Sequence, residues 1–186
     1  MLNAIKMKVY TYILSAIVLL FLFDKSFAQS KEDRSHKIFA IKKTYQKINS
    51  YKKYNIITID DGEKFLGNNT ENGASLTGYF TGDTLKKIAE WVGLSNRVIQ
   101  NDFYFKNEQL VFVYAIEKNY HCNDSSKTID YTKLELTFTR RYYFDNEKLF
   151  YTIIKDEKRN LSKQKDAADF LLRSKEYKKI LRANLR

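Results

Sequence analysis

The chain has 186 residues, a formal net charge of +11, 15% aromatic residues, no proline and a single cysteine. Because one cysteine cannot form an intramolecular disulfide, the fold must be stabilised by packing. The basic residues are spread along the chain rather than gathered in one stripe, which argues against a dedicated nucleic-acid-binding face.

Residues 1–28 have the pattern of a secretory signal peptide. Lys6 and Lys8 give a basic start, an apolar run covers residues 13–23, and Ser26-Phe27-Ala28 places small residues at the −3 and −1 positions of a signal-peptidase site. We therefore expect a cleaved leader, a mature chain that begins at Gln29, and a periplasmic or secreted protein.

An uncleaved membrane anchor is the alternative interpretation of this segment. However, the apolar run is shorter than the roughly 18 to 20 residues that span the hydrocarbon core, and Asp24 and Lys25 end it. We expect no stable membrane span after cleavage, and a mature chain of about 158 residues fits a single domain, residues 29–186. For an exported basic protein, an anionic envelope surface replaces nucleic acid as a partner.

Two segments have the apolar periodicity of amphipathic helices. In residues 31–50 the apolar stripe consists of Ile38, Ile41, Tyr45 and Ile48. In residues 163–183 it consists of Ala167, Phe170, Leu171, Tyr177 and Leu181. Both stripes need a surface to cover, and we expect both helices to pack on one face of a sheet rather than to lie on a membrane.

The region between the two helices contains an internal repeat with the pattern Tyr-Phe-x-(Gly/Asn)-(Asp/Glu)-x-Leu. Its three copies are residues 79–85, 104–110 and 143–149. Each copy places a turn-forming Gly or Asn beside an acidic residue, between segments rich in aromatic and β-branched residues. This arrangement is typical of a hairpin with a loop of about four residues, so the repeat predicts three successive hairpins.

Strands are predicted on both sides of each turn, with a further leading strand at residues 54–59. The other expected strands cover residues 74–80, 85–92, 98–105, 110–119, 133–144 and 149–156. In this order they form an antiparallel β-meander of about six to seven strands. The expected fold class is therefore α+β, with an N-terminal helix, the meander and a C-terminal helix.

Alternation with a period of two assigns side chains to the two faces of this sheet, if Phe and Leu of each repeat form a cross-strand pair. The face expected to form the core contains Leu76, Phe80, Leu85, Trp91, Phe103, Phe105, Leu110, Phe112, Tyr114, Ile116, Leu134, Leu136, Phe138, Phe144, Leu149, Tyr151 and Ile153. The opposite face collects Tyr79, Ile88, Asp102, Tyr104, Val111, Val113, Thr137, Thr139, Arg141, Tyr143 and Phe150. One β-bulge would exchange the two faces along a whole strand.

No catalytic, cofactor-binding or metal-binding motif is visible, and we expect a protein that is not an enzyme and has no cofactor. His121 and Cys122 are adjacent in a polar segment, but two ligands are too few for a zinc site, so Cys122 is expected to be a passive loop residue or to form an intermolecular disulfide. Arg140 falls among the core positions and needs an acidic or backbone partner, which predicts a structural ion pair.

At the repeat, the chain resembles a family of small exported proteins of Bacteroidetes of uncharacterised function. The resemblance rests on residues 76–88, which read Leu-Thr-Gly-Tyr-Phe-Thr-Gly-Asp-Thr-Leu-Lys-Lys-Ile, and on the Tyr-Phe segments at residues 102–110 and 141–149. It implies a periplasmic or secreted α+β domain and no catalytic residues, because the shared motif consists of turn and core residues.

The leading functional hypothesis is a non-catalytic binding module that recognises a protein or a glycan through an aromatic-rich sheet face. The candidate binding residues are Tyr79, Tyr104 and Tyr143, at equivalent positions of the repeat, and Arg141. In the competing interpretation these tyrosines only stabilise the sheet, by contacting each other and a second layer. A structural or envelope-assembly protein in a stable complex is the alternative function, followed by a small hydrolase.

Overall fold

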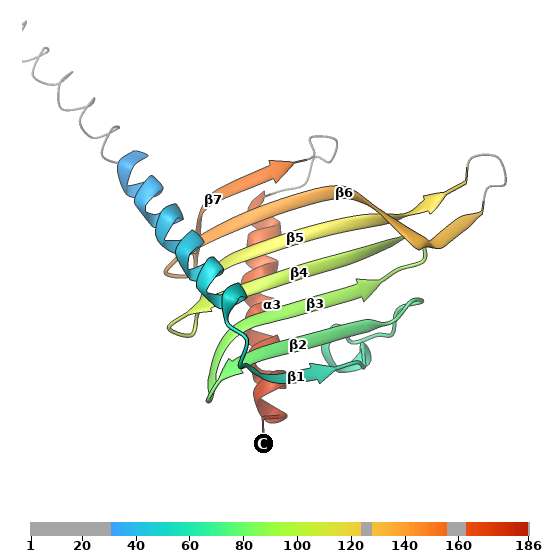
Figure 1. Ribbon diagram of the computed structural model, residues 1–186, viewed down its shortest axis with the longest axis horizontal. Coiled ribbons are helices and arrows are strands. Elements are labelled where there is room, and N and C mark those ends of the chain that lie inside the picture. Colours follow the sequence, from blue (N-terminus) through green and yellow to red (C-terminus); the bar gives the residue numbers. More distant parts are fainter. Residues whose placement is uncertain (1–30, 124–127, 156–162, 186) are drawn as a thin grey trace, which may run out of the picture. The chain divides into compact units, whose positions relative to one another are not determined.

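The computed structural model describes residues 31–123, 128–155 and 163–185 (Figure 1). The expected signal peptide lies outside these residues. The chain divides into two compact units, Met1–Lys42 and Lys43–Arg186. Of the first unit, residues 31–42 are described and are helical, with an ion pair one turn apart between Lys37 and Asp33 (3.0 Å). This helix continues to residue 50, and its residues 43–50 belong to the second unit.

The second unit contains a seven-stranded antiparallel sheet whose strands follow one another in space as they do in sequence. The strands are β1 (Asn55–Ile59), β2 (Ala74–Thr81), β3 (Thr84–Gly93), β4 (Arg97–Lys106), β5 (Gln109–Cys122), β6 (Ile129–Asp145) and β7 (Lys148–Lys155). Helix α2 (Glu63–Leu66) lies between β1 and β2, and helix α3 (Lys163–Ala183) follows the sheet. The predicted α+β class and the predicted antiparallel meander are confirmed.

The three repeats form the hairpins β2–β3, β4–β5 and β6–β7. In each one Phe and Leu are cross-strand partners, as expected: Phe80 with Leu85, Phe105 with Leu110, and Phe144 with Leu149. The loops are tighter than the predicted four residues. The pair between the Phe–Leu pair and the turn still belongs to the strands, which leaves only two residues in the turn.

A β-bulge follows the turn in every hairpin. The register shifts between Tyr and Phe of each repeat, so that the residue directly after the repeat Leu has no partner: Lys86, Val111 and Phe150. An extra residue reverses the orientation of all later side chains on its strand. The face assignment made from simple alternation is therefore wrong beyond each bulge.

The exchange affects residues on three strands. Six residues that were expected in the core lie on the opposite face. Their cross-strand partners are Tyr104 or other residues of that face. The six residues are Trp91, Phe112, Tyr114, Ile116, Tyr151 and Ile153. Ile88 and Val113 were expected on that opposite face, yet both are fully buried in the core. Leu134 and Leu136 are also not core residues, since both are exposed near the far end of β6.

Helix α3 covers one face of the sheet with the predicted apolar stripe. Phe170 contacts the rings of Phe103 and Tyr142, with centroids 5.7 and 5.0 Å apart, and Leu181 is fully buried. Leu181 lies so close to the sheet that a β-carbon on Gly78 would come within 2.9 Å of its methyl group. Each large apolar side chain buried here contributes roughly 1.5–3 kcal/mol to stability.

The last two turns of the N-terminal helix, residues 43–50, contact the other face. The Tyr45 ring lies 5.0 Å from the ring of Tyr104, and the Asn49 amide donates to the Tyr104 hydroxyl at 3.2 Å. Tyr104 follows Phe103 on β4, and neighbouring residues of a strand point to opposite faces. These contacts correct the expectation that both helices pack on one face of the sheet.

Candidate functional site: an aromatic row and the open band beside it

The predicted binding tyrosines belong to a row that crosses the sheet on the face opposite α3. The cross-strand register places these residues side by side, and we call them the aromatic row: Tyr79, Lys87, Tyr104, Phe112, Tyr143 and Tyr151. Its tyrosines on β2, β4 and β6 are the equivalent Tyr of each repeat. The bulge that follows each turn places Lys87, Phe112 and Tyr151 opposite these tyrosines on the neighbouring strands.

Contacts run without interruption along the aromatic row. The Lys87 ammonium lies 5.6 Å from the ring centre of Tyr79 and 5.2 Å from that of Tyr104. Phe112 lies 5.6 Å from Tyr104 and 5.0 Å from Tyr143. Such cation–π and tilted aromatic pairs each contribute about 0.5–1.5 kcal/mol beyond the area that they bury. The row thus stabilises the sheet, as the competing interpretation of the tyrosines predicted.

Two of the four predicted binding residues are inaccessible. Tyr104 is 1% exposed and Tyr143 is 2% exposed, so the expectation that their side chains would be at least partly accessible is wrong. Burial raises the pKa of both phenols, with Asp102 contributing to the shift at Tyr104, and both rings stay neutral. Tyr79 and Arg141 are partly exposed and remain available to a ligand.

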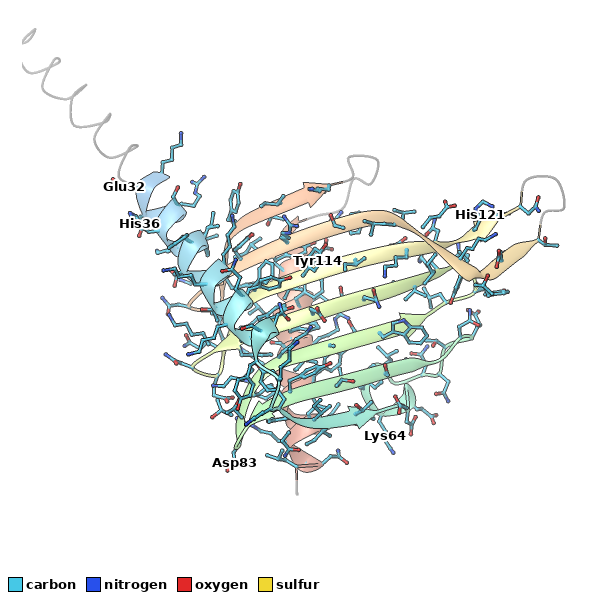
Figure 2. The ribbon with its side chains drawn as sticks, viewed as in Figure 1. Glu32, His36, Lys64, Asp83, Tyr114 and His121 are labelled. Carbon is cyan, nitrogen blue, oxygen red and sulfur yellow. The ribbon has the colours of Figure 1, made fainter. Side chains whose placement is uncertain are left out.

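The next positions on the same face form a more accessible surface, which we call the open band. It contains six partly exposed residues of consecutive strands: Trp91, Gln100, Asp102, Tyr114, Ile116 and Arg141. Tyr114 projects from β5 in the middle of the sheet (Figure 2), and the Arg141 guanidinium lies 5.4 Å from its ring centre. Of these residues, only Arg141 was a predicted binding residue.

Each polar member of the open band has a distinct environment. The Asp102 carboxylate accepts hydrogen bonds from Lys87 (2.8 Å) and from the Tyr104 hydroxyl (3.2 Å), which ties it to the aromatic row. Among the residues that the structure describes, Arg141 has no carboxylate partner. Its guanidinium is thus held in place by Tyr114 while its hydrogen-bond donors remain available.

The buried charges on the α3 side are structural. The Glu90 carboxylate is 2% exposed and accepts hydrogen bonds from Tyr177 (2.5 Å), Arg173 (2.7 Å) and Asn101 (2.6 Å). The bonds from Tyr177 and Arg173 attach α3 to β3, and the bond from Asn101 joins β4 to β3, so the carboxylate is fully engaged.

Arg140 forms a second buried ion pair. Its guanidinium donates to Asp166 of α3 and to the Tyr142 hydroxyl, so the predicted structural ion pair of Arg140 is confirmed. Asp166 also accepts a hydrogen bond from Tyr142 at 2.8 Å. Both charged clusters therefore join α3 to the sheet.

His121 and Cys122 are the last two residues of β5, where they pair with Asp130 and Ile129, so the expectation that Cys122 is a loop residue is wrong. The His121 imidazole contacts the Glu135 carboxylate at 2.7 Å, and Cys122 is an exposed free thiol. Within residues 31–123, 128–155 and 163–185, no group of three His, Cys, Asp or Glu side chains could hold a metal ion. In the same ranges no helix is both long enough and apolar enough to span a membrane.

Comparison of the chain with protein-family models, curated proteins and solved structures gave no match. The site must therefore be interpreted from its own geometry. Sequence reasoning missed Trp91 and Tyr114 as surface residues because it placed them in the core. No sequence signal marks the bulge that exchanged the two faces, because the bulged residues Lys86, Val111 and Phe150 share no residue type.

Proposed function

We propose that the protein is an exported, non-catalytic binding module, and that it recognises a protein or a glycan on the open band. The observation that carries this proposal is the partly exposed set of aromatic, guanidinium and amide groups on consecutive strands of one sheet. The predicted aromatic-rich face is retained in this proposal, but its contact surface shifts from Tyr104 and Tyr143 to their neighbours.

The chemistry of the open band suits recognition. Trp91 and Tyr114 supply rigid apolar surface, while Arg141 and Gln100 supply directed hydrogen bonds, a combination that is enriched at binding interfaces. The buried aromatic row, which residues 43–50 contact, holds the adjacent backbone fixed. A binding surface on a rigid sheet loses little conformational entropy when a partner binds.

The test compares two substitutions in the open band with a matched substitution outside it. Tyr114→Ala and Arg141→Ala should each weaken partner capture by about 1–3 kcal/mol and leave the melting temperature nearly unchanged. Partners would be sought on a glycan array and by capture from an envelope extract, and their affinities would then be measured by titration. Tyr131→Ala, at an exposed tyrosine near the far end of β6, is the control. Unchanged binding by both open-band variants would exclude this surface.

A structural or envelope-assembly role is the second candidate, and a different surface favours it. The far end of the β5–β6 hairpin extends beyond β7, whose pairing with β6 begins only at Thr139. This end carries large exposed apolar side chains: Ile129, Tyr131, Leu134 and Leu136. Exposed apolar groups that lie together are typical of surfaces buried in a complex.

The two candidates predict opposite results for the same variants. In an assembly protein, Tyr131→Ala and Leu136→Ser should reduce the apparent mass of the protein purified with its partners, whereas Tyr114→Ala should not. In a binding module that uses the open band, the order is reversed. Size-exclusion chromatography with light scattering, performed on the protein isolated from its native envelope, measures this difference.

A further inference from the structure

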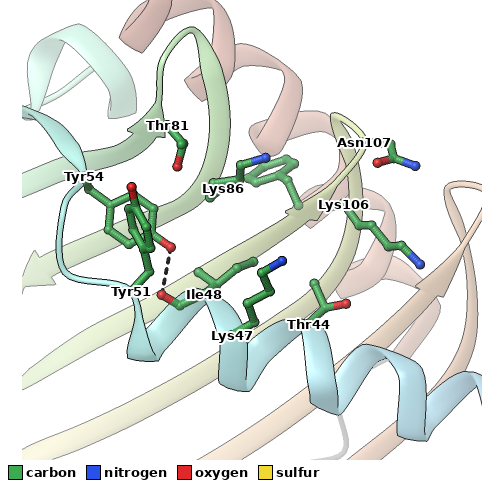
Figure 3. Close-up of a pocket in the computed structure, with 10 residues that line it drawn as sticks. Thr44, Lys47, Ile48, Tyr51, Tyr54, Thr81, Lys86, Lys106 and Asn107 are labelled. Atoms are coloured by element: carbon green, nitrogen blue, oxygen red, sulfur yellow. Dashed lines mark hydrogen bonds between the residues drawn. The ribbon is translucent and has the colours of Figure 1, made fainter.

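A pocket of about 400 Å³ lies at the turn end of the sheet, next to the end of the N-terminal helix (Figure 3). It belongs entirely to the second unit and is separate from the open band. Its lining consists of Thr44, Lys47, Ile48, Tyr51, Tyr54, Thr81, Lys86, Phe105, Lys106 and Asn107. We call it the basic pocket, because it contains three lysines and no acidic residue.

Three different elements bring the lysines together. Lys47 lies in the last turn of the N-terminal helix, and Lys106 ends β4. Lys86 is the bulged residue of the β2–β3 hairpin, and a bulge commonly redirects a side chain toward a site. The other two hairpins have Val111 and Phe150 at this position, so only the first repeat places a charge here.

The positive charge of the basic pocket is not neutralised by neighbouring side chains. In the part of the chain that the structure describes, Lys47, Lys86 and Lys106 form no ion pair. The nearest carboxylate in the β4–β5 turn, that of Glu108, is engaged elsewhere: it accepts hydrogen bonds from Arg182 (2.7 Å) and from the Leu85 backbone amide (3.2 Å). Cations that line one pocket without a counter-charge attract an anion.

The remaining walls of the basic pocket are aromatic and hydroxyl groups. The rings of Tyr51 and Tyr54 meet at 65° with their centres 4.8 Å apart, and Phe105 is buried beside Lys106. The Tyr54 hydroxyl donates to the Ile48 carbonyl oxygen at 2.8 Å, which satisfies one carbonyl at the helix end that would otherwise repel an anion. Thr81 and Asn107 provide neutral hydrogen-bonding groups at the rim.

We propose that the basic pocket binds the carboxylate of an acidic sugar residue, with the lysines holding the acid group and the tyrosines contacting the sugar ring. The lysines alone would suit any anion, but aromatic rings with hydroxyl and amide groups beside them also suit a ring that is apolar on its faces and polar at its edge. This site is independent of the open band and would remain if the open band bound no partner.

The experiment measures binding of three probes to the purified mature protein by isothermal titration calorimetry and by NMR shifts. Glucuronate carries both the ring and the acid, glucose only the ring, and inorganic phosphate only an anion. Glucuronate should bind more tightly than either of the others, and its affinity should fall as salt is raised from low to physiological ionic strength. Equal binding of glucose and glucuronate would overturn the proposal, as would equal binding of phosphate and glucuronate.

The lysines are tested with matched charge changes. Lys86→Gln should weaken glucuronate binding about tenfold, the usual effect of removing one charged hydrogen-bond partner. Lys52→Gln removes the same charge from an exposed residue that does not line the basic pocket, and should leave binding unchanged. Equal weakening by both variants, or by neither, would overturn the assignment.

A glucuronate-terminated tetrasaccharide distinguishes the two sources of such a ligand. Tighter binding of the tetrasaccharide than of glucuronate assigns the site to a chain end of an acidic polysaccharide, and equal binding assigns it to the free acid. Both results support the proposal. If Tyr51→Ala does not weaken glucuronate binding, the proposed contact between the tyrosines and the sugar ring is excluded.

Discussion

At the scale of single residues, the equivalent tyrosines of the repeat have different roles although their sequence context is the same. Tyr104 and Tyr143 are buried in the aromatic row, whereas Tyr79, at the same repeat position, is partly exposed. The difference comes from the neighbours: Tyr45 of the helix end and Phe112 both contact the ring of Tyr104. Burial, and not residue type, thus decides which tyrosine can meet a ligand.

Substitution of Tyr104 by Ser is therefore expected to cost stability rather than binding. The change removes a buried ring and its contacts with Tyr45, Phe112 and Lys87, and should lower the free energy of unfolding by about 3–5 kcal/mol, the usual cost of deleting a buried aromatic side chain. Urea titration measures the effect. Tyr114→Ser, on the same face but partly exposed, is the matched control and should cost much less; equal effects would mean that the aromatic row is not a stabilising element.

At the scale of elements, the sequence predicts the strands and turns well but not their faces. The repeat identified all three hairpins and the Phe–Leu pairs that flank their turns, because turn residues and β-branched segments leave a local signal. The bulge after the Leu of each repeat leaves no such signal, since Lys86, Val111 and Phe150 share no residue type. As a result, Tyr114 was assigned to the core and the open band could not be predicted.

The faces contacted by the helices were also beyond prediction. The stripes of residues 31–50 and 163–183 show only that each helix has an apolar side, and either face of a sheet could receive it. The contacts that decide the matter join residues far apart in the sequence, such as Asn49 with Tyr104 and Arg173 with Glu90. The basic pocket was missed for the same reason, because its lysines come together only when the helix end meets two hairpins.

The tight turns lead to a prediction about backbone strain. Asn146 and Glu147 both have positive φ angles (48° and 58°), the geometry of a type I′ turn, in which glycine is favoured at the second position. Glu147→Gly should therefore raise the free energy of unfolding by about 1 kcal/mol. Glu147→Ala, like Glu147→Gly, loses the exposed ion pair with Lys175, but it keeps the strained conformation. It should therefore give no gain in stability in a thermal or urea denaturation. A gain with Ala equal to that with Gly would refute the strain argument.

At the scale of the whole molecule, the two faces of the sheet have different chemistry. On one face α3 is attached through a buried apolar stripe and two charged clusters, centred on Glu90 and Arg140. On the other face, the buried side chains are mainly aromatic and include Tyr104 and Tyr143. The fold is thus stabilised on both sides by buried phenol groups, which respond to alkaline pH.

Stability is expected to decrease above pH 10. Burial raises the pKa of Tyr104, Tyr142, Tyr143 and Tyr177 above the ordinary value of 10.0. Above that pH the unfolded tyrosines lose their protons while the folded ones retain them, so the folded state binds more protons. The free energy of unfolding should then fall by up to about 1.4 kcal/mol per pH unit for each of these tyrosines.

Urea titrations at several pH values between 8 and 11, followed by phenolate absorbance, test this dependence. Tyr142→Phe removes one buried phenol while keeping its ring, and should reduce the slope by the contribution of one group. A free energy of unfolding that stays constant up to pH 11 would contradict the prediction.

Export remains a prediction from the leader pattern of residues 1–28. N-terminal sequencing of the protein recovered from the envelope or the medium should begin at Gln29, because Ser26-Phe27-Ala28 meets the requirements of signal peptidase. Replacement of Ala28 by a bulky residue such as Phe should block cleavage and retain the precursor. Recovery of the intact leader in the native protein would instead indicate an anchored form.

The spatial order of the strands, which repeats their order in the sequence, has a consequence for how the protein is assembled. A chain that leaves a translocation pore with its N-terminus first can add one hairpin at a time, since every strand pairs with the strand just before it. The rings of Phe80, Phe103 and Phe105 remain exposed to water throughout this growth, because their cover, α3, emerges last. Until then the protein is vulnerable to aggregation, so the final helix sets the moment at which folding is complete.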